Sequence, residues 1–293
     1  MSILSVRSLS KAFGGVRALD NVSFDVGEGE FLALIGPNGA GKSTCFNIVN
    51  GQIRPDGGDV RFAGRGIVGL PPREIWRLGI GRTFQIAATF GSMTVAENVQ
   101  LALASHHGEI FRFGGALRQR RLESALGLLE QVGMKEAAQH ACKELAYGDV
   151  KRVELAIALA NGPRLLLMDE PTAGMAPRER NDLIALVKRL VVERNVSVLF
   201  TEHSMDVVFA YADRIIVLAR GMLIAQGSSA AIRDNPQVQQ VYLGTGRTFS
   251  PHAQTASRRA GLPMASPRPL SRRTACSSCS LTSPRCETGS ATA

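Results

Sequence analysis

A glycine-rich stretch near the amino terminus combines residue types that can hold a phosphate group. Residues 36–43 read G-P-N-G-A-G-K-S, which fits the pattern G-x-x-x-x-G-K-[S/T]. Glycines let backbone N–H groups turn inward around phosphate oxygens, and the start of a following helix favours negative charge. In this pattern Lys42 pairs with the β- and γ-phosphates, and the Ser43 hydroxyl is a ligand for Mg²⁺. The stretch predicts a nucleoside triphosphate site formed by Gly36, Pro37, Asn38, Gly39, Ala40, Gly41, Lys42, Ser43 and Thr44.

Two adjacent acids, Asp169 and Glu170, follow an apolar run at residues 165–168. A carboxylate at the end of such a strand can hold Mg²⁺ through water, and a second one can orient an attacking water molecule. Taken alone, the pair is also compatible with an ordinary solvated strand end. Together with the phosphate-binding stretch, it predicts nucleotide hydrolysis rather than simple storage.

The elements around these residues alternate between short apolar runs and helical patterns, which predicts an α/β domain over residues 1–245. The apolar run 31–35 ends at Gly36, as a buried strand does, and residues 42–50 predict a helix closed by Gly51. The other predicted elements are strands at 5–7 and 18–26 around a turn at 14–15, strands at 165–168 and 196–200, a helix at 178–194, and a hairpin of 215–218 with 223–225.

The segment between residues 85 and 145 differs in character. Residues 96–105 and 117–132 have helical periodicity, and no convincing strand lies between them. One apolar stripe is formed by Leu122, Ala125, Leu126, Leu129 and Val132. We predict an inserted helical subdomain at about residues 86–144.

The formal net charge of +9 is distributed unevenly. Residues 246–293 carry +6, whereas the preceding 245 residues carry +3. The basic segment is rich in Ser, Thr, Pro and Arg and lacks Val, Ile, Tyr and Trp, so we predict a disordered C-terminal tail. The net charge therefore gives no reason to expect a nucleic-acid partner for the folded part.

Three interpretations of the tail stay open. Cys276, Cys279 and Cys286 could hold zinc, although no fourth ligand is obvious. The arginines could instead touch acidic phospholipid or RNA. We favour a dispensable extension, because the composition is that of out-of-frame translation of GC-rich DNA. The odd total of five cysteines argues against a disulfide framework and for a reducing cytoplasm, and no apolar run approaches the roughly 20 residues that span a bilayer.

Taken in order and spacing, these motifs resemble the ATP-binding subunits of ABC transporters over residues 3–245. The resemblance rests on residues 36–44, Gln85, 145–149, 165–171 and His203. Within the superfamily the chain is most similar to the ATP-binding subunits of branched-chain amino-acid importers. That similarity rests on residues 11–19, 81–85, 93–99 and 241–244.

The resemblance implies roles for single residues. Phe13 stacks on adenine, Glu170 is the general base and His203 senses the γ-phosphate. Gln85 senses Mg²⁺ and the attacking water, so that the implied metal-binding residues are Ser43, Gln85 and Asp169. Seen without this context, Phe13 could equally belong to the core and His203 would be an ordinary surface histidine. The other four histidines, at 106, 107, 140 and 252, have no such context.

The resemblance also implies that Ala146, Tyr147, Gly148 and Asp149 contact the γ-phosphate of an ATP held by a second subunit. Ala146 stands where the family pattern usually has Ser, which removes a hydroxyl donor. Asp149 stands where Gln is common; it places a negative charge near an anion unless it caps the next helix. Ala176 replaces the Asp or Asn usual in the loop that links the two subunits. We expect a working but weaker contact.

The implied fold is α/β, a P-loop NTPase core of the ABC ATPase type with an antiparallel β subdomain and the inserted helical subdomain. The implied cofactors are ATP and Mg²⁺, and the activity is ATP hydrolysis that drives uptake of branched-chain amino acids or a related small polar solute such as an amide or urea. Implied partners are a second ATP-binding subunit, separate transmembrane permease subunits and, indirectly, a periplasmic solute-binding protein. We expect a peripheral location on the cytoplasmic face of the inner membrane.

Two alternatives to an importer stay open. The chain could serve a lipid-exporting ABC system, since such cassettes are similar to these. It could also be a soluble ABC ATPase that acts on nucleic acid or a macromolecular machine, but such proteins often carry two cassettes or a long coiled coil, and here there is one cassette and no heptad run. A kinase or GTPase is disfavoured because no N-K-x-D base-reading motif is present.

Overall fold

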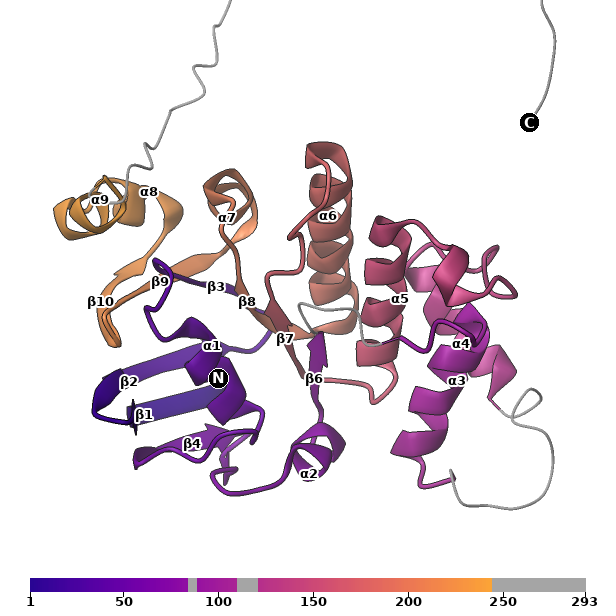
Figure 1. Cartoon of the computed structure of the whole chain (residues 1–293), viewed down its shortest axis with the longest axis horizontal. Helices are drawn as coiled ribbons and strands as arrows, with labels where there is room; N and C mark the ends of the chain where they lie inside the picture. Colours follow the sequence, from indigo (N-terminus) through magenta and orange to yellow (C-terminus); the bar gives the residue numbers. More distant parts are fainter. Residues whose placement is uncertain (84–88, 110–120, 244–293) are drawn as a thin grey trace, which may run out of the picture. The chain divides into compact units, whose positions relative to one another are not determined.

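The computed structural model describes residues 1–83, 89–109 and 121–243. The chain divides into a compact unit, Met1–Ser250, and a second unit, Pro251–Ala293, all of which falls outside the described residues. The predicted tail and Gln85 lie outside them as well, and so does the predicted boundary at residue 245. The first unit contains two β-sheets with helices around them (Figure 1).

One sheet is antiparallel and is built mainly from a long hairpin. Its strand order is β2-β1-β4-β5, and the strands are β1 (Ser2–Phe13), β2 (Val16–Gly27), β4 (Gly57–Phe62) and β5 (Arg65–Gly66). The hairpin turns at Gly14 and Gly15, whose φ angles of 51° and 88° favour glycine. The two predicted strands are confirmed but are longer than predicted, since their pairing runs from Ser2 with Gly27 to Phe13 with Val16; β1 is also paired with β4.

The other sheet positions the candidate site. Its strand order is β10-β9-β3-β8-β7-β6, and the strands are β3 (Phe31–Ile35), β6 (Ile80–Thr83), β7 (Leu165–Asp169), β8 (Ser197–Thr201), β9 (Arg214–Ala219) and β10 (Met222–Gly227). Neighbouring strands are parallel except in the β9–β10 hairpin. Since the carboxyl ends of parallel strands meet at one edge, the segments that follow β3, β8 and β7 emerge side by side.

The helices are α1 (Lys42–Val49), α2 (Pro72–Arg77), α3 (Val95–His106), α4 (Leu122–Gln131), α5 (Tyr147–Leu159), α6 (Pro177–Arg194), α7 (Met205–Tyr211), α8 (Ser229–Arg233) and α9 (Pro236–Leu243), with a 3₁₀ turn at Cys142–Glu144. The helices predicted at 42–50 and 178–194 are confirmed as α1 and α6.

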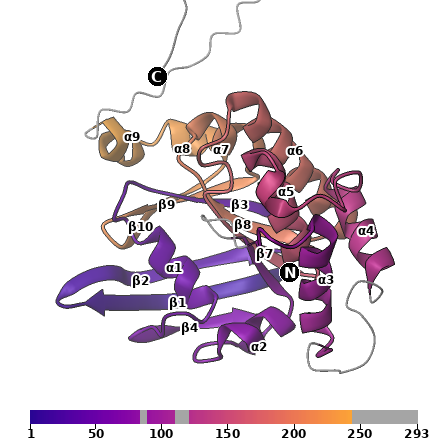
Figure 2. The ribbon, with the colours of Figure 1, turned by 45° about the vertical axis from the view of Figure 1, so that its right-hand side comes forward.

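Strand β3 shows how the parallel sheet is buried on both faces. Phe31, Ala33 and Ile35 belong to a hydrophobic cluster that includes residues of α5, α6 and α7. Leu32 and Leu34 belong to a second cluster with α1 and the antiparallel sheet. Figures 1 and 2 show the same layers, with the antiparallel sheet and α1 on one side and α5 to α7 on the other. The sequence 31–35 is apolar at every position because both faces of the sheet are covered at β3.

Helices α3 and α4 lie beside α5 (Figures 1 and 2). Helix α3 starts at a capping box in which Thr94 Oγ1 accepts a hydrogen bond from Glu97 N at 3.1 Å and Glu97 Oε2 accepts one from Thr94 N at 2.9 Å. In the described parts of residues 89–144, no strand occurs, and one isolated bridge joins Thr94 to Ala141. Helix α4 begins at Leu122 rather than at the predicted 117, and residues 117–120 fall outside the described residues. The limits of the predicted helical subdomain stay a prediction.

The predicted hairpin is confirmed as β9–β10. Its turn residues, Arg220 and Gly221, have φ angles of 50° and 79°, as a two-residue hairpin turn requires. This turn reaches the phosphate-binding stretch, because Gly221 N donates to Ala40 O at 3.2 Å. The strands predicted at 165–168 and 196–200 are confirmed with shifts of one residue. Among the helices described, none is long and apolar enough to cross a bilayer.

Candidate functional site

The glycine-rich stretch forms the connection between β3 and α1, as predicted. Two of its glycines are required by close backbone contacts. A Cβ on Gly36 would lie 2.2 Å from Leu218 O, and one on Gly41, whose φ is 101°, would lie 2.3 Å from Ala18 O. The loop is therefore wedged between β9 and β2, and its path is set by neighbours from both sheets.

Lys42 and Ser43 begin α1 directly after this loop. The Lys42 side chain is only 7% exposed, and its Nζ donates to Gly36 O at 2.8 Å and to Pro37 O at 3.2 Å. The Lys42 ammonium group thus lies against the backbone of the glycine-rich loop. This is the loop in which the phosphate is predicted to bind. Ser43 is exposed, so its hydroxyl is accessible to a ligand, and the N-cap of the helix, Gly41, offers no side-chain cap.

Asp169 ends β7 and Glu170 follows it, and both are held by one residue of the adjacent strand, Thr201 at the end of β8. Thr201 is fully buried; its Oγ1 donates to Asp169 Oδ1 at 2.7 Å and accepts from Glu170 N at 3.0 Å. Glu170 N also donates to Thr201 O at 3.2 Å. The threonine hydroxyl thus sets the positions of both acids. Sequence reasoning missed it, because the role depends on which strand lies beside β7.

Arg82, on β6, approaches the same acid from the other side. Its Nη2 lies 3.7 Å from Asp169 Oδ2, and its Nη1 donates to Gln52 Oε1 at 3.1 Å. The side chain is 9% exposed, and burial lowers the pKa of the Arg82 guanidinium while the Asp169 carboxylate opposes that effect. Arginine stays charged under such conditions, so Arg82 supplies fixed positive charge beside Asp169. Arg82 belongs to the 81–85 motif, but nothing in the pattern indicated this contact.

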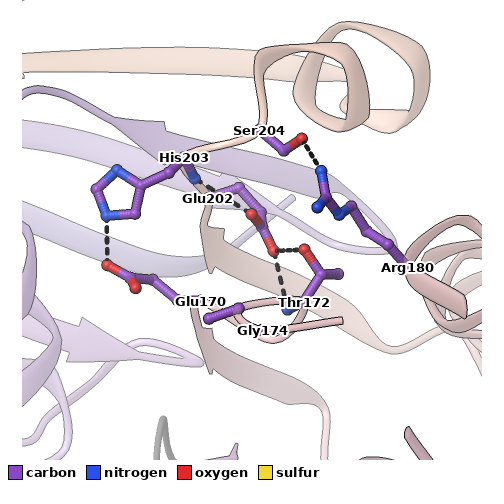
Figure 3. A pocket seen from close by; sticks show the side chains of 8 residues that line it. Glu170, Thr172, Gly174, Arg180, Glu202, His203 and Ser204 are labelled. Atoms are coloured by element: carbon purple, nitrogen blue, oxygen red, sulfur yellow. Dashed lines mark hydrogen bonds and ion pairs between the residues drawn. The ribbon is translucent and has the colours of Figure 1, made fainter. Parts of the chain in front are cut away.

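Glu170 and His203, 33 positions apart in the chain, point toward one another (Figure 3). His203 Nε2 lies 2.5 Å from Glu170 Oε1. Glu170 has a φ angle of 49°, a left-handed conformation that a non-glycine residue adopts only when its surroundings hold it there. The sequence pointed to the two residues separately; the parallel neighbours β7 and β8 bring them together.

A cavity of about 250 Å³ opens beside this pair. It is lined by Glu170, Thr172, Ala173, Gly174, Arg180, Glu202, His203 and Ser204 (Figure 3). Arg180 Nη1 is hydrogen-bonded to Ser204 Oγ, and its Nη2 donates to Met175 O at 3.4 Å. The lining therefore places a cation, a histidine and two carboxylates around one space at the ends of β7 and β8. Sequence reasoning assigned no role to Arg180, Glu202 or Thr172.

Phe13 ends β1 next to the hairpin turn and is 47% exposed. Lys11 Nζ lies 5.4 Å from the centroid of its ring. The interpretation of Phe13 as a core residue is therefore wrong, and an exposed ring is available for stacking. A second cavity, of about 310 Å³, lies near the turn of the same hairpin and is lined by Ser10, Lys11, Ala12, Arg17, Leu19, Asp20 and Asp56.

The segment 146–149 begins α5. Ala146 is the N-cap and makes no side-chain hydrogen bond, so the alternative in which Asp149 caps the helix is wrong. Asp149 lies instead in the first turn, where a negative charge is favourable to the helix dipole. Tyr147 is exposed and Gly148 is buried. A Cβ on Gly148 would lie 3.5 Å from Met175 Cε, which places the start of α5 against the loop that precedes α6.

Two predicted features cannot be placed. Gln85 lies outside the described residues, and so do Cys276, Cys279 and Cys286. In the described ranges, no group of three or more His, Cys, Asp or Glu side chains is arranged to hold a metal ion. Ser43 and Asp169 nevertheless provide a hydroxyl and a carboxylate, the oxygen donors that suit Mg²⁺ bound largely by phosphate and water.

Comparisons with known proteins identify the family to which this fold belongs. Residues 19–173 match the family described as ABC transporter, and residues 222–248 match the branched-chain amino acid ATP-binding cassette transporter family. The chain is 41% identical over 249 residues to the high-affinity branched-chain amino acid transport ATP-binding protein BraF of Pseudomonas aeruginosa, a match that covers 83% of this chain and 98% of that protein.

Solved structures with the same fold include two cassettes. The nucleotide-free ATP-binding cassette of an ABC transporter superposes with a TM-score of 0.74 at 32% identity, covering 83% of this chain and 99% of that one. A dimeric cassette in a post-hydrolysis state, bound to ADP and Pi, gives a TM-score of 0.66 at 29% identity, covering 77% of this chain and 98% of that one. The predicted α/β cassette fold is confirmed.

Proposed function

Because this chain belongs to the ABC transporter family, we propose that it is the ATP-hydrolysing subunit of an importer for branched-chain amino acids or a related small polar solute. The chain is an ATPase of this family. The proposal that the chain hydrolyses ATP rests on one observation. Glu170 and His203 contact each other at the edge of the sheet where the phosphate-binding loop also begins. The importer part rests on the 41% identity to a branched-chain amino acid transport protein.

The proposed chemistry assigns each group a step. Lys42 and the N–H groups of the loop hold the β- and γ-phosphates. Ser43 and Asp169 would hold Mg²⁺, which would supply positive charge to the phosphate oxygens. The Glu170 carboxylate accepts a proton from water as the water oxygen bonds to the γ-phosphorus. The bond between that phosphorus and the β,γ-bridging oxygen breaks, and ADP and phosphate leave. In the structure, His203 Nε2 is hydrogen-bonded to Glu170 Oε1. When ATP binds, the His203 side chain turns to the γ-phosphate, and the Glu170 carboxylate becomes free to accept a proton from water.

We further propose that two cassettes close around ATP. The amino terminus of α5, with Ala146, Tyr147, Gly148 and Asp149, faces the nucleotide of the second subunit, and its helix dipole favours the phosphate. The dimeric relative bound to ADP and Pi supports such a pairing. ATP then binds the closed pair better than the open pair, and this difference in affinity drives the permease.

Closure of the two cassettes changes the conformation of membrane-spanning permease subunits, which are separate chains. A periplasmic solute-binding protein delivers the solute to these permease subunits. The cassette then sits peripherally on the cytoplasmic face of the inner membrane. Support comes from the relatives, which are transport ATP-binding proteins.

The test of hydrolysis compares Glu170→Gln and Lys42→Ala with Glu193→Gln, which alters an exposed acid at the end of α6. We expect the first two to lose nearly all ATPase activity, since each removes a group predicted to act on phosphate or water. Glu193→Gln should match the wild type. Full-rate hydrolysis by either Glu170→Gln or Lys42→Ala contradicts the mechanism.

The transport role needs a separate test. Affinity purification from membranes, followed by mass spectrometry, should recover a permease and identify any second cassette. Uptake of labelled leucine and of urea by vesicles that contain the complex then tests the solute. Recovery in the cytosol with nucleic acid supports the soluble alternative, and lipid export by the purified complex supports the exporter.

A further inference from the structure

Glu202 is a buried carboxylate beside the hydrolytic pair for which the mechanism above has no role. It follows Thr201 at the end of β8, precedes His203 and is 4% exposed. Its Oε1 accepts hydrogen bonds from Thr172 N at 3.0 Å and from Thr172 Oγ1 at 2.6 Å. Its Oε2 accepts a hydrogen bond from His203 N at 3.2 Å. Figure 3 shows the carboxylate between the two residues.

Burial of a carboxylate has a large desolvation cost unless its oxygens are hydrogen-bonded. Here the two oxygens point to two different chain segments, and across the described residues no ion pair to Glu202 is formed. Arg180, in the same cavity wall, is hydrogen-bonded to Ser204 and Met175 instead. The three donors of Thr172 and His203 therefore supply the hydrogen bonds that offset the burial of the Glu202 oxygens.

The two segments joined by Glu202 are both next to the reacting groups. Thr172 comes two residues after Glu170, and its loop runs on through Gly174 and Met175 to α6. A Cβ on Gly174 would lie 3.7 Å from Tyr147 Cε1, so this loop touches the start of α5. Glu202 thus connects the backbone of His203 to the loop that lies between Glu170 and α5.

We infer that Glu202 is a positioning residue for hydrolysis, which fixes the backbone of His203 beside Glu170 by tying it to the loop at Thr172. This inference rests on the proposed function. A shift of His203 N relative to Thr172 changes the distance from the imidazole to Glu170, because both segments are short connections anchored on β7 and β8. Binding of ATP by the loop before α1 does not involve these contacts.

The sharpest variant is Glu202→Gln, which keeps the shape and removes the charge. Glutamine has one acceptor oxygen, so it can satisfy Thr172 or His203 but not both, and its NH₂ group faces an N–H donor on the other side. In the full-length chain we expect kcat for ATP hydrolysis to fall about tenfold or more. We expect KM and the affinity for trinitrophenyl-ATP to stay within about twofold, because Lys42, Ser43 and Phe13 are unaffected.

Thr172 provides the second variant and the control. Thr172→Val removes the Oγ1 donor and should lower kcat in the same direction, whereas Thr172→Ser keeps the donor and should retain wild-type kcat. The double variant Glu202→Gln/Thr172→Val should be no slower than Glu202→Gln alone, since both changes break one link. Multiplicative losses in the double variant, or a kcat of Glu202→Gln within twofold of the wild type, overturn the inference. A KM that rises with the fall in kcat also overturns it, because it indicates general damage to the site.

Failure of this inference is distinguishable from failure of the proposed function. If the wild-type chain hydrolyses ATP and Glu170→Gln does not, the proposed hydrolysis stands whatever Glu202→Gln does. If the wild-type chain does not hydrolyse ATP, or if Glu170→Gln hydrolyses it at full rate, the proposed function fails and the Glu202 inference fails with it.

Discussion

Replacement of Thr201 by valine tests how far one buried hydroxyl organises Asp169 and Glu170, the acids proposed to bind Mg²⁺ and to activate water. Valine keeps the branched shape but removes the donor to Asp169 Oδ1, which lies 2.7 Å away, and the acceptor of Glu170 N. A hydrogen bond to a charged group contributes about 1.5–3 kcal/mol. Glu170 N keeps Thr201 O as an acceptor at 3.2 Å, so that half of the change costs less. We therefore expect Thr201→Val to lower the free energy of unfolding by about 2 kcal/mol.

The effect on Mg²⁺ follows from the same contact. Asp169 keeps the positive charge of Arg82 at 3.7 Å but loses the donor that orients its carboxylate. Loss of such an outer partner typically weakens metal binding 10- to 100-fold. We expect the Mg²⁺ concentration for half-maximal ATPase activity to rise at least about tenfold, with a smaller change in the activity at saturating Mg²⁺.

Urea unfolding followed by the fluorescence of Trp76, the single tryptophan, gives the stability, and ATPase assays over a Mg²⁺ series give the metal requirement. Thr201→Ser is the matched control, because it keeps the hydroxyl and removes a methyl group. It should retain the wild-type Mg²⁺ dependence. Identical Mg²⁺ dependence in Thr201→Val and the wild type, or equal impairment in both variants, would refute the reasoning.

Four further predictions concern other parts of the structure. Gly41→Ala should abolish trinitrophenyl-ATP binding and destabilise the fold, because its Cβ would meet Ala18 O at 2.3 Å; Gly39→Ala, with nothing within 4 Å, should cost only about 1–2 kcal/mol of backbone strain, and equal effects would contradict this. Phe13→Ala should weaken ATP binding about tenfold with little change in urea stability, since the ring is exposed, whereas Phe13→Trp should restore binding. Burial raises the pKa of the Cys45 thiol to about 12, against 9.0 for an unperturbed thiol, so above pH 9.0 the unfolded state loses a proton that the folded state keeps, and the free energy of unfolding falls. By pH 10 this effect should cost the wild type about 1.4 kcal/mol and should be absent from Cys45→Ala, so parallel curves of stability against pH for the two proteins would argue against it. Removal of residues 246–293 should leave ATPase activity unchanged, and a large loss would assign the tail a role.

Sequence patterns predicted those parts of the site that depend on local backbone chemistry. Glycines at positions 36 and 41, followed by Lys42 and Ser43, form a pattern that by itself predicts a loop able to wrap around phosphate. The apolar run before Asp169 predicts a buried strand, and an acid after a buried strand must lie at its exposed end. For this reason the loop and the acid pair were predicted, and most of the strands and helices that the sequence did predict lie within one or two residues of their observed bounds.

Contacts between distant segments were beyond reach of the same patterns. Thr201 and Glu202 carried no signal, because a threonine and a glutamate at a strand end are common, and their roles arise only when β8 lies next to β7. Arg82 likewise meets Asp169 only because β6 pairs with β7 on the other side. The resemblance to a family named His203 but not its contact with Glu170 at 2.5 Å.

The amino-acid sequence by itself determined which groups could hold phosphate, Mg²⁺ and an attacking water, and that they would lie at the ends of strands. The order of the strands, β3 beside β8 beside β7, decided which of those groups meet. The physical reason is that glycine conformation and apolar periodicity are properties of neighbouring residues, whereas hydrogen bonds between strand ends depend on packing across the whole sheet. The sequence thus provides Glu170, Thr201 and His203, and the tertiary structure decides that Thr201 holds Glu170 and that His203 faces it.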